Sequence, residues 1–174
     1  MSTAKDIKVR KAKAWTALNG MEKIWKSDIS RALKERFFTA TVESVLLYGS
    51  KAWSMTSAME KSLNCCYTRM LRAAFNISWR DHLTNEELYL SIPQVTEKVR
   101  SRRLQLAGHC FRHPELPAHD VLLWQPKHGN RGRGRPAVTF PAMLRRDSET
   151  ETNEELRTLL GDRNLWRSKW GARP

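Results

Sequence analysis

The chain has 174 residues, and its 31 Lys and Arg exceed its 18 Asp and Glu by 13. The surplus is concentrated, because residues 1–26 carry seven basic and two acidic side chains, and residues 96–136 carry nine and three. Such blocks raise the local positive potential, which makes nucleic acid the leading partner class, ahead of anionic membrane. A composition of 40% apolar and 28% charged residues is typical of a globular chain and excludes a disordered one.

No apolar run approaches the roughly 18 to 20 residues that span a membrane, and the basic start lacks the apolar region of a signal peptide. The three cysteines, Cys65, Cys66 and Cys110, form neither a disulfide framework nor a CxxC pair. We therefore expect reduced thiols, no membrane association and an intracellular location, in the nucleus, the cytoplasm or both.

Apolar residues at helical spacing predict two long helices that pair as an antiparallel hairpin. The stripe of the first helix comprises Ile7, Ala14, Leu18, Met21 and Trp25. Ser27 and Asp28 offer N-cap side chains for the second helix, which follows apolar spacing to Tyr48 and ends at Gly49.

Three further helices follow in chain order. Ser57-x-x-Glu60 and Thr84-x-x-Glu87 have the spacing of capping boxes, which predicts a third helix to about residue 74 and a short fourth helix that Pro93 stops. The fifth helix covers about residues 96–112, with an apolar line beside a polar one that suits phosphate tracking. The polar line comprises Lys98, Arg102, Gln105, His109 and Arg112.

Prolines at 114 and 117 interrupt regular structure after the fifth helix, and residues 127–136 have the composition of an exposed strip. Two short helices follow, one opened by Thr152-x-x-Glu155 and closed at Gly161, the last holding Trp166. No alternating β pattern occurs. The expected fold class is all-α, with a helical bundle over residues 5–112, a basic Pro/Gly/Arg-rich linker over 113–138 and a short helical tail over 139–174.

The segment RGRGRP, from Arg131 to Pro136, alternates guanidinium groups with residues that lack bulk. It resembles the AT-hook, a short minor-groove binder, but the usual basic flank is replaced by Ala137 and Val138. Groove binding, nonspecific phosphate contact and a solvated linker all remain open for this strip.

Residues that would support catalysis or metal binding do not form a recognisable set. His109, Cys110, His113 and His119 lie within eleven positions, but a structural zinc site uses two closely spaced ligand pairs. The six Asp are scattered without a DD or DxD motif, and no nucleophile or P-loop motif occurs. We therefore expect no catalytic residues, no bound metal and no cofactor in this chain.

Five blocks in order resemble the region after the palm in reverse transcriptases of non-LTR (LINE-type) retrotransposons. The blocks are LLYGSKAW from Leu46, LRAAFNISWRDHLTNEEL from Leu71, RRLQLAGHCFRHP from Arg102, RGRGRPAVTF from Arg131 and DRNLWR from Asp162. The resemblance implies a thumb-like helical bundle and a basic C-terminal region. It also implies that polymerase chemistry belongs to a palm absent from this chain.

The sequence and this resemblance together predict a nucleic-acid-binding fragment that grips RNA, DNA or a hybrid through phosphates, without sequence specificity. The expected contacts are Lys8, Lys11, Arg102, Arg103, Arg112, Arg131, Arg133 and Arg135. Two alternatives stay open: a domesticated helical module whose exposed tryptophans dock a protein partner, and a nonfunctional relic of a truncated element.

Overall fold

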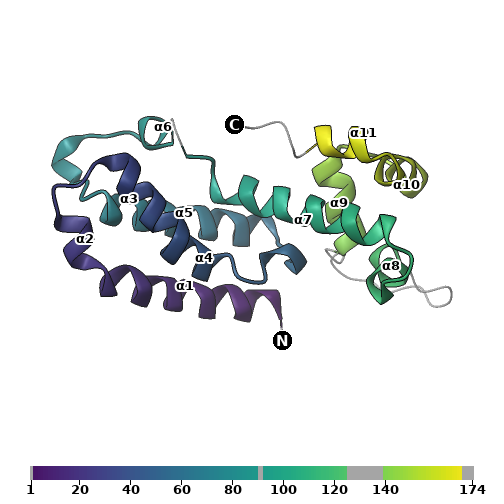
Figure 1. Cartoon of the computed structure of the whole chain (residues 1–174), viewed down its shortest axis with the longest axis horizontal. Helices are drawn as coiled ribbons and strands as arrows, with labels where there is room; N and C mark the ends of the chain where they lie inside the picture. Colours follow the sequence, from purple (N-terminus) through teal and green to yellow (C-terminus); the bar gives the residue numbers. More distant parts are fainter. Residues whose placement is uncertain (1, 90–91, 125–138, 170–174) are drawn as a thin grey trace. The chain divides into compact units, whose positions relative to one another are not determined.

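A computed structural model of the chain describes residues 2–89, 92–124 and 139–169 (Figure 1). These residues form helices joined by turns and contain no strand, which confirms the all-α fold class. The described helices include none with the length and apolarity needed to cross a bilayer.

The chain divides into two compact units. Unit 1 comprises Met1–Gly49 and Met55–Lys98, and unit 2 comprises Ser50–Ser54 and Val99–Pro174. The division falls inside one helix, α7 (Val95–Arg112), whose first turn belongs to unit 1 and whose remainder belongs to unit 2. The boundary expected near residue 112 is therefore placed differently by the packing, because residues 99–112 pack with the tail helices.

Unit 1 is a helical bundle in which α1 packs on α4, on the π-helix and on α5 (Figure 1). Its elements are α1 (Thr3–Gly20), α2 (Glu22–Lys26), α3 (Arg31–Phe38), a π-helix (Thr39–Glu43), α4 (Ser44–Leu46), α5 (Ser57–Ala74), a 3-10 turn (Trp79–Asp81) and α6 (Asn85–Leu88). The apolar stripe of α1 is buried as its spacing predicts, and the Trp25 indole donates to the Leu18 carbonyl at 2.8 Å.

Three details of unit 1 differ from the expected helix ends. The first helix is interrupted at Met21, directly after Gly20, a residue of low helix propensity. The N-cap of α3 is Ser30 rather than Ser27 or Asp28, and its hydroxyl accepts from the Leu33 N–H at 3.3 Å. The N-cap of α5 is Thr56, one residue before the predicted Ser57. The capping box of Thr84 and Glu87 is confirmed.

Unit 2 contains α7 from Val99 onward, α8 (Pro117–Leu122), α9 (Phe140–Ser148), α10 (Asn153–Gly161) and α11 (Arg163–Ser168). Its buried cluster joins residues of α7 to residues of α8, α9, α10 and α11. The cluster comprises Leu104, Ala107, Cys110, Leu122, Leu123, Leu144, Leu156, Leu160 and Trp166. The segment after residue 139 is therefore part of a packed core rather than an appended tail.

Two helix starts in unit 2 follow local rules. Pro117 begins α8 instead of breaking structure, because a proline in the first turn has no hydrogen bond to lose. Thr139 caps α9, with Pro141 in that helix's first turn, and Thr152 and Glu155 form the predicted capping box of α10. These caps set the direction in which each short helix enters the core.

Candidate nucleic-acid interface

One face of α1 carries lysines and no acid. Ile7, Ala14 and Leu18 are buried on the opposite face, so Lys5, Lys8 and Lys13 project from the exposed side of the helix. They cover about 140° of its circumference at 3.6 residues per turn. Within the described part of the chain no carboxylate pairs with these three ammonium groups. We call this set the α1 lysine face; Lys8 was an expected contact, whereas Lys5 and Lys13 were not.

The other two basic residues of α1 are held by unit 1 itself. The Arg10 guanidinium lies 3.4 Å from the Asp6 carboxylate and 4.3 Å from the centre of the Tyr48 ring. Lys11, an expected phosphate contact, donates its ammonium to the carbonyl and hydroxyl oxygens of Ser62 at 2.9 and 2.7 Å. Lys11 therefore links α1 to α5, because its half-buried side chain is directed inward.

Arg103 is a correction to the expected contacts. Its side chain is 1% exposed and forms a hydrogen-bonded ion pair with Asp147, which is 5% exposed. A guanidinium committed to a buried carboxylate cannot reach a phosphate without leaving that carboxylate unpaired, which is costly. Arg103 therefore joins α7 to α9 and is not an interface residue.

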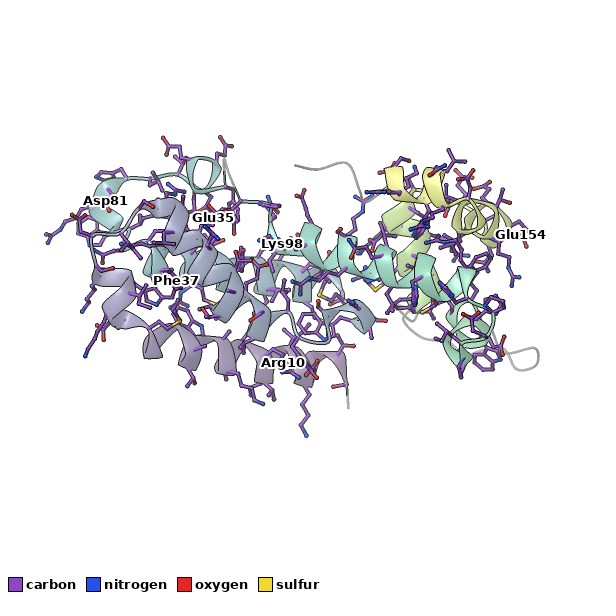
Figure 2. The ribbon with its side chains drawn as sticks, in the orientation of Figure 1. Arg10, Glu35, Phe37, Asp81, Lys98 and Glu154 are labelled. Carbon is purple, nitrogen blue, oxygen red and sulfur yellow. The ribbon has the colours of Figure 1, made fainter. Side chains whose placement is uncertain are left out.

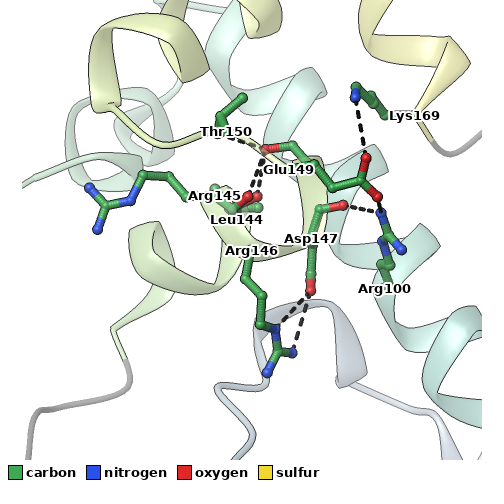
Figure 3. Close-up of polar contacts among 9 residues, drawn as sticks. Arg100, Leu144, Arg145, Arg146, Asp147, Glu149, Thr150 and Lys169 are labelled. Carbon is green, nitrogen blue, oxygen red and sulfur yellow. Dashed lines mark hydrogen bonds and ion pairs between the residues drawn. The ribbon is translucent and has the colours of Figure 1, made fainter.

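The end of α9 gathers several charged groups around Asp147 and Glu149 (Figure 3). Arg100 donates to the Asp147 carbonyl and lies 3.5 Å from the Glu149 carboxylate, while Arg146 lies 3.4 Å from the Asp147 carboxylate. Lys169 approaches Glu149 at 3.8 Å. Cations at a helix C-terminus complement its unpaired carbonyls, so this cluster stabilises the end of α9.

Arg112 serves α10 in the same way, because its guanidinium donates to the Leu160 carbonyl at 3.1 Å. Arg102 is half-buried on α7. Within the polar line predicted for residues 98–112, Arg112 is thus used inside the protein, since it binds the end of a helix from its own unit. Periodicity alone does not distinguish such residues from phosphate contacts.

Lys98, the first residue of that polar line, belongs to a buried network in unit 1. Its ammonium lies 2.5 Å from the Glu43 carboxylate and 3.1 Å from the Tyr67 hydroxyl, which donates to Glu43 at 2.6 Å. Glu43 is 3% exposed and closes the π-helix. Burial, and next the Glu43 charge, raise the pKa of Tyr67 far above its usual range. In this network the positive charge of the Lys98 ammonium therefore offsets the negative charge of the buried Glu43 carboxylate.

Arg131, Arg133 and Arg135 lie outside the residues that the structure describes.

Among the described residues no group of three His, Cys, Asp or Glu side chains is placed to hold a metal ion. The His109 and His113 rings lie 4.4 Å apart, and His113 contacts Glu115 at 2.7 Å. Cys110 is buried, and burial raises the pKa of the Cys66 thiol.

The α1 lysine face is therefore one cationic surface that the described residues leave open in unit 1. Lys5 and Lys13 were identifiable from the sequence, because the apolar stripe of the helix defines its opposite face. In a comparison with known proteins, no protein family, curated protein or solved structure matches this chain.

Proposed function

We propose that this chain binds nucleic acid without sequence specificity, as the thumb-like and C-terminal part of a non-LTR retrotransposon reverse transcriptase. The order of the five sequence blocks supports the family, and the α1 lysine face supports the mode of binding. Phosphates bind to such a face by releasing counterions, which requires unpaired cations rather than a shaped pocket. Arg131, Arg133 and Arg135 are further phosphate contacts in the proposal, while Lys11, Arg103 and Arg112 serve the fold.

The observation that carries the proposal is the absence of carboxylate partners along the α1 lysine face. A helix kept soluble by charge alone usually mixes both signs, which allows pairs one turn apart. On α1 the one acid, Asp6, pairs with Arg10. Lys5, Lys8 and Lys13 therefore present their full positive charge to a polyanion.

The experiment is a salt titration of binding by fluorescence anisotropy, on a labelled 20-base-pair DNA duplex, an RNA duplex and a hybrid. The variant Lys5→Ala/Lys8→Ala/Lys13→Ala removes three contacts. The slope of log affinity against log salt should fall by about 2.7 units on duplex DNA, at roughly 0.9 per phosphate. Raising the salt concentration from 50 to 200 mM should then lower the affinity of the variant by a factor about 40-fold smaller than the factor for the original chain.

A charge-matched variant controls for the loss of net charge. Lys23→Ala/Arg36→Ala/Arg69→Ala also removes three exposed cations, one each from α2, α3 and α5. We expect a smaller change of slope from it, because these residues come from three different helices rather than from one helix face. Equal slopes for the two variants would contradict a localised interface. Binding that does not respond to salt would instead support a protein-interaction module.

The assignment of synthesis to another segment has its own test. Primer extension with the purified chain, a primed RNA template and Mg²⁺ should give no incorporated nucleotide. Such synthesis needs clustered carboxylates that hold two metal ions, and in the described ranges no group of three His, Cys, Asp or Glu side chains is placed to hold even one. Metal-dependent incorporation by this chain would overturn the proposal.

A further inference from the structure

We infer that Trp79, together with Arg80, is a stacking platform for an unpaired base of a single-stranded segment. The inference rests on the proposed function and adds a second kind of contact to it. A single strand exposes the faces of its bases, which duplex DNA buries between neighbouring base pairs. Aromatic side chains stack on such faces regardless of base identity.

The exposure of Trp79 is the first observation. Its side chain is 78% exposed, whereas Trp25, Trp53 and Trp166 are at most 4% exposed. The Arg80 guanidinium carbon lies 5.5 Å from the centre of the Trp79 ring, within cation–π range. Among the described residues no carboxylate pairs with Arg80. The Trp79 indole and the Arg80 guanidinium therefore lie next to each other. A nucleotide offers one target for each of them, a base for the indole and a phosphate for the guanidinium.

The backbone that carries Trp79 is held rigidly. The Ser78 hydroxyl accepts from the Arg80 N–H, and the Asp81 carboxylate accepts from the Ser78 N–H at 2.6 Å, which forms a capping box. Asn76 and His82 adopt left-handed conformations, with φ of 55° and 47°, at either side of this turn. Because these hydrogen bonds already order the turn in the free chain, less conformational entropy is lost when it binds a base.

A second anchor fixes the base of the loop. The Arg72 guanidinium, on α5, donates to the Leu83 carbonyl at 2.7 Å and to the Asn85 side chain at 3.0 Å. Figure 2 shows Asp81, and with it this turn, at an end of unit 1 rather than along the sides of its helices. The turn is therefore fixed by hydrogen bonds to α5 and within itself, with its exposed indole accessible to a nucleic-acid strand.

The surroundings of Trp79 favour a base over a protein. Ser78, Arg80, Asp81 and His82, the nearest neighbours of Trp79 in this turn, are all exposed and polar. Protein hot spots need a ring of neighbouring contacts that excludes water, whereas stacking needs only one accessible ring face. The chemistry of the turn therefore matches a nucleobase, with Arg80 contacting the adjoining phosphate.

The test compares a labelled 20-nucleotide single strand with a 20-base-pair duplex, using Trp79→Ala and Trp79→Phe. Trp79→Ala should weaken single-strand binding by about tenfold, leave duplex binding within about twofold, and leave the salt slope unchanged, because stacking releases no counterions. Trp79→Phe should restore most of the loss. Trp124→Ala, which removes another exposed tryptophan at 65%, is the matched control and should have little effect.

Each outcome separates this inference from the proposed function. If the unmodified chain binds neither probe, both fail. A second outcome is that the α1 lysine variant lowers the salt slope as expected, while Trp79→Ala binds the single strand as tightly as the unmodified chain does. The proposed function then stands, and the stacking platform alone is wrong. Equal losses on single strand and duplex, or an equal loss from Trp124→Ala, would also overturn it. Thermal melting should show that Trp79→Ala keeps its fold, since the indole has little packing to lose.

Discussion

Replacing Gly108 with alanine should destabilise unit 2, because α7 and Trp166 approach too closely there for any side chain. A Cβ at residue 108 would lie 2.3 Å from both Cδ1 and Nε1 of Trp166. The indole cannot move aside easily, since it is fully buried and its Nε1 donates to the Leu104 carbonyl at 2.8 Å. Overpacking costs about 1–3 kcal/mol, and losing the indole hydrogen bond adds about 1 kcal/mol.

The assay is urea unfolding followed by near-ultraviolet circular dichroism, with Gly161→Ala as the matched control. Gly161 is also in a helix of unit 2, but a Cβ there meets no atom within 4 Å. We expect Gly108→Ala to lose about 2–4 kcal/mol and Gly161→Ala to lose almost nothing. Adding Trp166→Leu to Gly108→Ala should cost less than the sum of the two single changes, because the smaller side chain admits the new methyl group.

Equal stability of Gly108→Ala and Gly161→Ala would refute the close packing of α11 on α7. A strictly additive double variant would refute the specific clash with Trp166 while leaving the general packing intact.

Two further predictions concern buried polar groups. Arg103→Met should destabilise unit 2 by about 3 kcal/mol in chemical denaturation, because Asp147 loses its buried partner. The double variant Arg103→Met/Asp147→Leu should recover part of that loss, since it leaves no buried carboxylate unpaired. A double variant less stable than the single variant would contradict the pairing. Because burial and Glu43 raise the pKa of Tyr67, the folded chain retains a proton that the unfolded chain releases above about pH 10. The contribution of Tyr67 to stability should therefore be constant below about pH 10 and fall above it, and Tyr67→Phe should flatten the alkaline fall; an identical alkaline profile would contradict it.

Helix positions and most caps could be predicted from the sequence, because they depend on residues within one or two turns of each other. The buried stripe of α1 and the capping boxes of Thr84 and Thr152 are examples. The shift of a cap from Ser57 to Thr56 is an error of one residue, where adjacent hydroxyls offer equivalent chemistry.

The candidate site was only partly predictable. Lys8 is exposed on α1, but Lys11 contacts α5, and Arg103 pairs with Asp147, 44 residues later in the chain. A basic residue on a helix has the same local pattern whether it meets solvent or a distant carboxylate. Only the partner's position in space separates the two cases.

The helical fold class, the two concentrations of positive charge and the resemblance behind the proposed function all follow from the order of the amino acids alone. These properties are local or additive along the chain, so they do not depend on how the helices pack. Tertiary structure decided which cations remain available. It divided the chain within α7 and buried Arg103, because the apolar line of that helix needs the cluster around Trp166 to exclude water.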